Sequence, residues 1–308
     1  MVGSLPMNAA MHDDELMIDE DLVRSLLRRD LAAYAELPLR PLDSTGSTNR
    51  LFRLGEEHLV RLPRQPGGSA TITQEARRLP GFAANLAVAT PEVTAVGEPG
   101  FGYPERWSVV RWLEGEKPGP GAGDVTAADL AGVVTGLRRT EVPQEALEDP
   151  DLRWYRGEPI AGFDADVRFR LEECRELAEL DLDLDLDAVE TVWEQVMALP
   201  PADAEPRWVH GDLLAENLLS REGRLTAVLD FGALSVGDPT VDLICAWELL
   251  DAAGRDSFRA LLDLDDATWL RARGWALFIA LMTFPYYWRT MPVRCADRLV
   301  MARAAVAG

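Results

Sequence analysis

The chain has 308 residues, of which 47% are hydrophobic, and its formal net charge is −21 at pH 7. This length is too great for one small core and suits two packed lobes. The acidity argues against a nucleic-acid partner, which would need clustered Lys and Arg, and no apolar run of about 18 residues predicts a membrane span.

The acidic composition has two interpretations. An acidic cleft would steer a cationic substrate such as a polyamine, or the charge simply keeps the protein soluble. Residues 1–10 lack a basic segment followed by an apolar stretch, so we expect no secretory signal. Cys174, Cys245 and Cys295 form no CxxC pair, which indicates reduced core thiols in a cytoplasmic protein.

The first predicted elements follow an irregular polar start at residues 1–14. Leucines recur at three-to-five spacing through residues 19–35, which predicts an amphipathic helix with Asp19 as its N-cap. Short apolar runs bounded by turn residues then predict strands. These runs are residues 39–42, 49–54 and 58–62.

A helix is predicted over residues 72–86, interrupted at Pro80. Residues 92–96 and 107–113 predict two further strands. Five strands with one inserted helix are expected to form an N-terminal lobe over residues 15–113.

A Gly- and Pro-rich stretch at 114–124 is expected to be a linker. The remainder, 125–308, is predicted to be a mainly helical lobe. Within it, residues 181–187 alternate Asp and Leu, but the dense charge favours a solvated connection or a helix end over a strand. The predicted fold class is α+β, with an antiparallel sheet plus helix in the first lobe.

The most informative motif is HGDLLAEN at 210–217, followed by DFG at 230–232. Phosphorylation of a hydroxyl requires one carboxylate to accept the proton, and a carboxylate with an amide oxygen to hold Mg²⁺ against nucleotide phosphates. The spacing predicts Asp212 as the base and Asn217 and Asp230 as the Mg²⁺ ligands. An apolar strand runs directly into the second motif, which argues against chance.

This motif, together with GDPTVD at 237–242, resembles the aminoglycoside phosphotransferase family. The resemblance is most specific over residues 207–243. It implies a bilobal protein-kinase-like fold and ATP- or GTP-dependent O-phosphorylation of a small-molecule hydroxyl. A cationic aminoglycoside antibiotic is the first candidate and a macrolide the second.

Two other functions remain open. A metabolite kinase acting on a choline-, homoserine- or sugar-like substrate would share the catalytic residues and differ only in the pocket. A non-catalytic, kinase-like nucleotide-binding module is the other alternative, and the complete set of Asp212, Asn217 and Asp230 argues against it. The oligomeric state cannot be read from the sequence.

Nucleotide-binding residues are expected in the first lobe. The only lysine is Lys117, so the strand-borne cation that grips the phosphates must be an arginine. Arg61 on the third strand is the candidate, with Glu75 on the following helix as its partner. Arg64, Arg77 and Arg78 are rivals in the same region.

Other nucleotide contacts are predicted from position. The Ser/Thr-rich loop between the first two strands could cradle phosphate through Ser47 and Thr48, although an ordinary hairpin turn is the alternative. The base is expected to dock on the backbone from Arg111 to Leu113, with Val110 controlling the depth of the pocket.

Supporting and substrate residues complete the predicted site. His210 is expected to brace the catalytic loop. Asp238 and Asp242 either support this loop or cap the helix that begins near Thr240, and we expect a structural role for Asp238 and the capping role for Asp242. The family resemblance implies acidic and aromatic substrate contacts from the second lobe, with packing or surface roles as the alternative. The candidates are Trp154, Tyr155, Glu248, Asp251 and Tyr287, with Tyr286 and Trp288 beside them.

Overall fold

The structure is a computed structural model that describes residues 14–42, 48–121, 123–177, 182–202 and 205–308. The chain divides into two compact units. Unit 1 comprises Met1–Pro80 and Pro91–Leu113, and unit 2 comprises Gly81–Thr90 and Glu114–Gly308. Among the described residues, no helix is both long and apolar enough to cross a bilayer.

Unit 1 is built on a five-stranded antiparallel sheet with the order β1-β2-β3-β5-β4. The predicted strands are confirmed to within one residue, except that β5 ends two residues before the predicted 113. It ends there because its register partner, β3, begins at His58 opposite Arg111. The strands are β1 Leu39–Pro41, β2 Asn49–Leu54, β3 His58–Pro63, β4 Val93–Gly97 and β5 Trp107–Arg111.

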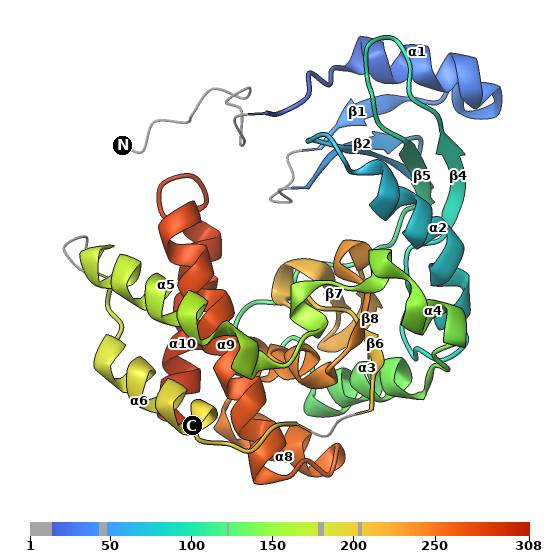
Figure 1. Cartoon of the computed structure of the whole chain (residues 1–308). Helices are drawn as coiled ribbons and strands as arrows, with labels where there is room; N and C mark the ends of the chain where they lie inside the picture. Colours follow the sequence, from blue (N-terminus) through green and yellow to red (C-terminus); the bar gives the residue numbers. More distant parts are fainter. Residues whose placement is uncertain (1–13, 43–47, 122, 178–181, 203–204) are drawn as a thin grey trace. The chain divides into compact units, whose positions relative to one another are not determined.

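Helix α1 (Glu20–Asp30) lies beside this sheet (Figure 1). Asp19 caps it as predicted, because its side chain accepts a hydrogen bond from the backbone N–H of Leu22 at 2.8 Å. Its buried face, which includes Leu26, packs into the same apolar cluster as Phe52 of β2. The helix is shorter than the predicted 19–35, because Leu31 leaves the helical conformation at φ −134° and ψ 61°.

Helix α2 (Ser69–Phe82) begins three residues before its predicted start and contains Pro80 in its last turn. The chain then joins unit 2 over Gly81–Thr90. This segment belongs to unit 2 because its backbone pairs with strand residues of that unit. The backbone N–H of Ala89 donates to Thr226 O at 2.9 Å, and Ala89 O accepts from Val228 N at 3.0 Å.

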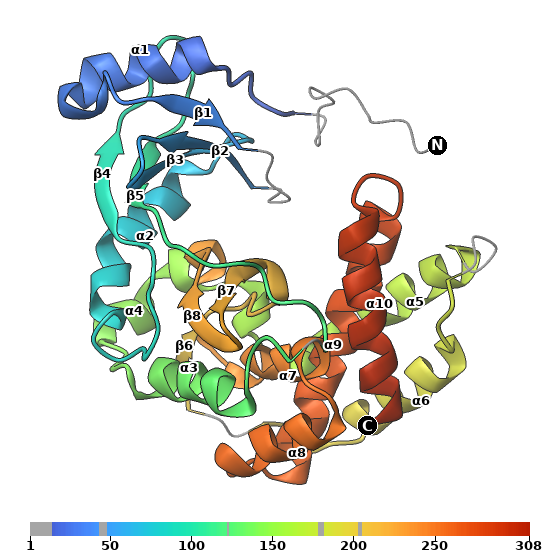
Figure 2. The same cartoon turned by 180° about the vertical axis from the view of Figure 1, so that it is seen from behind.

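Unit 2 is mainly helical, as predicted. Its two longest helices, α9 and α10, lie side by side (Figure 2). Residues 178–181 lie outside the described residues. Residues 182–184 are non-helical, and Asp185 caps α6 by accepting from Ala188 N at 2.9 Å. The helices are α3 Ala127–Arg139, α4 Gln144–Glu148, α5 Asp164–Leu177, α6 Leu186–Met197, α7 Cys245–Leu249, α8 Ala252–Leu261, α9 Asp266–Tyr287 and α10 Pro292–Ala307.

Two antiparallel strand pairs interrupt these helices and carry the motifs. Strand β6 (Arg207–Val209) pairs with β9 (Ser235–Gly237), and β7 (Leu218–Arg221) forms a hairpin with β8 (Arg224–Val228). The loop after β6 contains Asp212, and the chain reaches Asp230 shortly after β8.

The cysteines lie in the unit 2 core. Cys174, Cys245 and Cys295 are all free and buried, as expected for reduced core thiols. Burial raises the pKa of the Cys174 thiol to about 12 and that of Cys295 to about 11. These thiols are therefore protonated and poorly nucleophilic near neutral pH.

Candidate active site

The loop that carries Asp212 begins where β6 ends. Trp208 and Val209 of that strand are buried, so the strand is fixed in the core. Gly211 then adopts φ +79°, and a Cβ there would lie 3.0 Å from Ala233 O. The left-handed backbone and the lack of room explain why glycine occupies the middle position of the motif.

Asp242 braces this loop. Its two carboxylate oxygens accept the backbone N–H groups of His210 and Gly211, each at 2.8 Å. Burial raises the pKa of Asp242, and the hydrogen bonds from these amides only partly offset that effect. The predicted helix-capping role of Asp242 is therefore wrong. Asp238 instead caps the following 3-10 turn, by accepting from Thr240 N at 3.0 Å.

The His210 side chain also holds the loop. Its Nε2 lies 2.9 Å from Leu229 O, and its Nδ1 accepts from the backbone N–H of Asp212 at 3.2 Å. A single neutral tautomer, with the proton on Nε2, satisfies both contacts. The ring also meets Phe231 edge-on at 4.8 Å. These contacts tie the catalytic-loop motif to the DFG motif.

The Asp212 carboxylate has a different partner on each oxygen. Oδ2 accepts from Asn217 Nδ2 at 2.9 Å, and the same nitrogen donates to the Asp212 backbone oxygen at 2.9 Å. Oδ1 accepts from Arg156 Nη1. Burial acts to raise the pKa of Asp212, but Arg156 and Arg298 outweigh it and lower the pKa, so the carboxylate is ionised at neutral pH.

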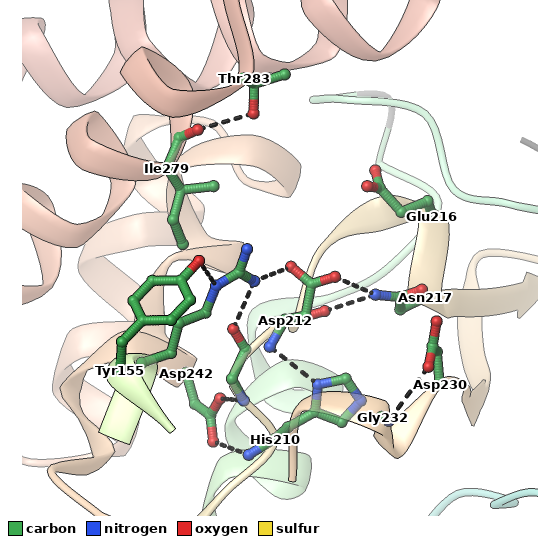
Figure 3. Close-up of polar contacts among 12 residues, drawn as sticks. Tyr155, His210, Asp212, Glu216, Asn217, Asp230, Gly232, Asp242, Ile279 and Thr283 are labelled. Carbon is green, nitrogen blue, oxygen red and sulfur yellow. Dashed lines mark hydrogen bonds and ion pairs between the residues drawn. The ribbon is translucent and has the colours of Figure 1, made fainter. Parts of the chain in front are cut away.

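Asn217 and Asp230 lie next to one another on one side of Asp212 (Figure 3). Asn217 O accepts from Leu229 N at 2.7 Å, which holds the two segments together. Asp230 has φ +52°, and its Oδ1 accepts from Gly232 N at 3.2 Å. Because the Asn217 amide nitrogen faces Asp212, its oxygen is left for other ligands.

This donor set fits Mg²⁺, which takes one or two carboxylates with phosphate and water oxygens. A carboxylate and an amide oxygen, as on Asp230 and Asn217, are hard oxygen ligands of the required kind. The described part of the chain contains no cluster of three or more His, Cys, Asp or Glu side chains suited to a metal ion.

Sequence reasoning missed Arg156, which lies in the 3-10 turn Tyr155–Gly157. Besides Asp212, its Nη1 donates to Gly211 O at 2.8 Å, and its Nε donates to the Tyr155 hydroxyl at 2.8 Å. The guanidinium also lies 5.0 Å from the Trp154 ring. Trp154 and Tyr155, predicted as substrate residues, thus support an arginine beside the base. Only the flanking aromatic residues could have signalled this.

Glu248 has the contacts of a packing residue, the alternative to a substrate role. It is 1% exposed, its Oε2 accepts from Ala215 N at 2.6 Å, and its Oε1 accepts from Arg298. Burial raises its pKa, although Arg298 opposes that shift. Arg298 Nη2 also donates to Glu216 at 2.6 Å. These buried charges anchor the segment that ends in Asn217.

The remaining substrate candidates do not form one group. Asp251 caps α8 by accepting from Gly254 N at 2.7 Å, so a capping role explains it. The Tyr287 ring packs under the Arg294 guanidinium at 5.0 Å, and Arg294 lies 3.3 Å from Glu216. Tyr287 is therefore linked through two charged side chains to the catalytic-loop segment.

In unit 1, Arg61 and Glu75 form the predicted ion pair. Arg61 Nη1 and Nη2 donate to the two Glu75 oxygens at 2.8 and 3.2 Å. Both side chains are buried, with 7% and 1% exposure. The rival Arg64 is engaged elsewhere, because its Nη1 donates to Glu15 at 2.5 Å.

The other nucleotide candidates of unit 1 differ in their surroundings. Ser47 lies outside the described residues, and Thr48 is exposed. Val110 is buried, and the Arg111 side chain pairs with Glu92 at 2.7 Å. Over the described residues, the backbone groups of Leu113 make no hydrogen bond, which leaves them available to a ligand.

Comparison with known proteins gives a family match. The model of a family described as "Phosphotransferase enzyme family" matches residues 39–275. An aminoglycoside 3'-phosphotransferase of Escherichia coli is 28% identical over 109 residues, which are 32% of this chain and 40% of the relative. A second one from Escherichia coli is 36% identical over 62 residues, 20% of this chain and 23% of the relative. The match thus spans about two fifths of the first relative's length.

Solved structures show the fold over nearly the whole chain. The GDP and kanamycin complex of APH(2")-IIia has a TM-score of 0.64 at 18% identity, covering 93% of this chain and 97% of that one. Macrolide 2'-phosphotransferase MphH from Brachybacterium faecium has a TM-score of 0.58 at 22% identity, with 92% and 96% covered. These similarities confirm the predicted α+β, kinase-like fold class, and such low identities carry the argument no further than the fold.

Proposed function

Because this chain belongs to the phosphotransferase enzyme family, we propose that it transfers the terminal phosphoryl group of a nucleoside triphosphate to a hydroxyl of a small molecule. The observation that carries the proposal is the grouping of Asp212, Asn217 and Asp230 (Figure 3). One carboxylate is positioned by the amide, and a second lies beside that amide. This is the minimum set of protein groups that phosphoryl transfer to a hydroxyl requires.

Asp212 is the base in this proposal. As the acceptor oxygen bonds to the terminal phosphorus, the bond from phosphorus to the β–γ bridging oxygen breaks, and the hydroxyl proton passes to Asp212. Asn217 holds the carboxylate in place through Oδ2. Asn217 and Asp230 would hold Mg²⁺, which neutralises charge on the phosphates when bound.

Nucleotide binding is assigned to unit 1. The bidentate contact with Glu75 fixes the orientation of the Arg61 guanidinium, as a cation that grips phosphate oxygens requires. The backbone of Leu113 supplies a donor and an acceptor for the base, and Val110, three residues earlier, is buried. Thr48 and Ser47 are the phosphate-loop residues. Both ATP and GTP suit this arrangement.

An aminoglycoside is the first acceptor class and a macrolide the second. The support is the family membership together with the net charge of −21, which attracts a polycation from solution. Metabolite alcohols such as choline, homoserine or a sugar are the competing acceptors, because the catalytic groups would be the same.

A screen for transfer tests the proposal. The protein is incubated with Mg²⁺ and either ATP or GTP, and with kanamycin, gentamicin, streptomycin, erythromycin, choline, homoserine or glucose in turn. Mass spectrometry then detects the addition of one phosphoryl group. The Asp212→Asn variant is the control and should form no product. Absence of product from every pair, together with no nucleotide binding by calorimetry, would overturn the proposal.

A further inference from the structure

The two oxygens of the Asp212 carboxylate are not equivalent. Oδ2 is engaged by Asn217, the residue beside Asp230. Oδ1 is therefore the oxygen left for an incoming hydroxyl, and it already accepts a charge-assisted hydrogen bond from Arg156 Nη1. Any acceptor that delivers its proton to Oδ1 must displace this contact or share the oxygen with it.

Arg156 lies on the acceptor side of the base. Tyr155 and Asn217 are on opposite sides of Asp212 (Figure 3). The Arg156 guanidinium bridges the Tyr155 hydroxyl and Asp212 Oδ1, so it occupies the side away from Asn217 and Asp230. The Asp212 side chain is 28% exposed, so solvent reaches the carboxylate, and the Arg156 side chain beside it is 14% exposed.

An aromatic platform supports the arginine. The Tyr155 ring meets Trp154 at 4.9 Å and Phe163 at 6.0 Å, and Phe163 contacts Trp275 of α9 at 5.5 Å. The turn that carries Arg156 is thus tied through aromatic contacts to α9. Its contact with Asp212 nevertheless uses one nitrogen and one oxygen only, a geometry that a ligand can open.

We propose that Arg156 is a specificity-determining residue that prevents water from acting as the phosphoryl acceptor at Asp212. This inference rests on the proposed function. In the rejected reaction, a water oxygen would bond to the terminal phosphorus, the bond to the β–γ bridging oxygen would break, and the water proton would pass to Asp212 Oδ1. The guanidinium occupies the oxygen that this proton must reach.

Water and a substrate alcohol differ in the binding energy available to them. A water molecule makes no further contacts with the enzyme, so it gains nothing that offsets loss of the arginine contact. A bound alcohol is held by the rest of its structure, and that binding energy can drive Arg156 off Oδ1. The enzyme would then release the base only when an acceptor is in place.

The loop has enough other supports to survive loss of the arginine. Asp242 holds the amides of His210 and Gly211, and His210 and Asn217 hold the backbone of Asp212. Removing the Arg156 side chain therefore leaves these supports of the base in place, and besides the Asp212 contact it removes one hydrogen bond to the loop, from Arg156 Nη1 to Gly211 O.

Hydrolysis of ATP and of GTP without any acceptor tests the inference. Arg156→Met should raise phosphate release by about tenfold, the effect of one charge-assisted hydrogen bond. Arg156→Lys keeps a charge near Asp212 and should give a smaller rise, and Tyr155→Phe, which removes the Nε anchor, about a twofold rise. Arg153→Met is the matched control, because Arg153 is exposed and, among the described residues, its side chain donates only to Leu147 O; it should leave the rate of hydrolysis unchanged.

The outcomes separate this inference from the proposed function. Hydrolysis by Arg156→Met that stays at or below the wild-type rate, in a variant with a wild-type melting temperature, overturns the inference. If that variant does not fold, an unchanged rate in both Arg156→Lys and Tyr155→Phe overturns it. The extra hydrolysis must also disappear in the Arg156→Met/Asp212→Asn double variant. Should Asp212→Asn alone hydrolyse nucleotide at the wild-type rate, the base assignment itself fails.

Discussion

Two arginine–carboxylate pairs, one in each unit, differ in geometry although their residue types are alike. In unit 1, Arg61 and Glu75 meet through two nitrogens and two oxygens, and neither side chain is more than 7% exposed. In unit 2, Arg156 meets Asp212 through one nitrogen and one oxygen, and the carboxylate is 28% exposed.

The comparison shows how one chemical pairing serves two purposes. A bidentate, buried pair is costly to open, because opening it leaves an unpaired charge in a region of low dielectric. It therefore suits a fixed cation. A monodentate pair whose carboxylate is partly exposed loses one arginine–carboxylate hydrogen bond when it opens, and solvent reaches the carboxylate. It therefore suits a base that must exchange partners during a reaction.

The largest effect on activity is expected from removing the carboxylate of the Arg156–Asp212 pair. Asp212→Ala should lower kcat by about 10²- to 10⁴-fold, because general-base and positioning contributions are lost together. Nucleotide affinity measured by calorimetry should stay close to that of the wild type. Retention of more than about half of the wild-type turnover at saturation would show that Asp212 is not the base.

Breaking the Arg61–Glu75 pair of unit 1 should affect both the stability of the protein and its nucleotide binding. Arg61→Ala leaves Glu75 buried without its arginine, which should cost about 3–5 kcal/mol in the free energy of unfolding, and should raise the nucleotide KM. Arg61→Lys should recover part of both losses. Urea unfolding and steady-state kinetics measure them.

Single changes of Arg64, Arg77 and Arg78 are the controls for this experiment and should matter less. A wild-type KM for Arg61→Ala, with a strong defect in one of the controls, would place the phosphate cation elsewhere in unit 1.

Removing the charge of Asp230, a proposed Mg²⁺ ligand in unit 2, should have an intermediate effect on nucleotide binding. Asp230→Asn keeps the shape of the side chain but removes its charge, and should raise the Mg²⁺ concentration for half-maximal nucleotide binding by about tenfold. Calorimetry with nucleotide at varied Mg²⁺ measures the shift. An unchanged metal dependence would remove Asp230 from the proposed metal shell.

A third pair, in which the arginine is exposed, should give the smallest effect. Asp129 accepts from Arg224 at 2.7 Å and completes the capping box of α3 with Thr126. Burial acts to raise the pKa of Asp129, but Arg224 and Thr126 outweigh it and lower the pKa. Asp129→Asn should therefore destabilise the protein by about 1 kcal/mol at pH 7.

The pH dependence of that loss has a definite sign. A lowered folded-state pKa contributes stability above the unfolded pKa of about 3.9, and this contribution is lost as pH falls through the folded value. The difference in melting temperature between wild type and Asp129→Asn should be constant near neutral pH and shrink in acid. A difference that grows toward low pH would contradict the assignment.

The sequence by itself determined the strands of unit 1, the mainly helical character of unit 2, and the linear motifs at 210–217 and 230–232. Each depends on residues close in the chain: alternation, helical period, caps and turn residues. The pairing of Arg61 with Glu75 could also be predicted, because the only lysine lies elsewhere and the strand and helix that carry the pair are neighbours in sequence.

Only the tertiary structure decided which polar partners meet across long stretches of chain. Arg156 lies 56 residues before Asp212, and Arg298 lies 50 residues after Glu248. The exchanged roles of Asp238 and Asp242 have the same origin, because both positions suit a cap locally and only packing brings Asp242 to the catalytic loop. A local sequence pattern determines which helix, strand or turn carries a side chain. Its hydrogen-bond partner and its burial depend on the packing of elements that are distant in the sequence, and the partner and the burial set the chemistry of the site.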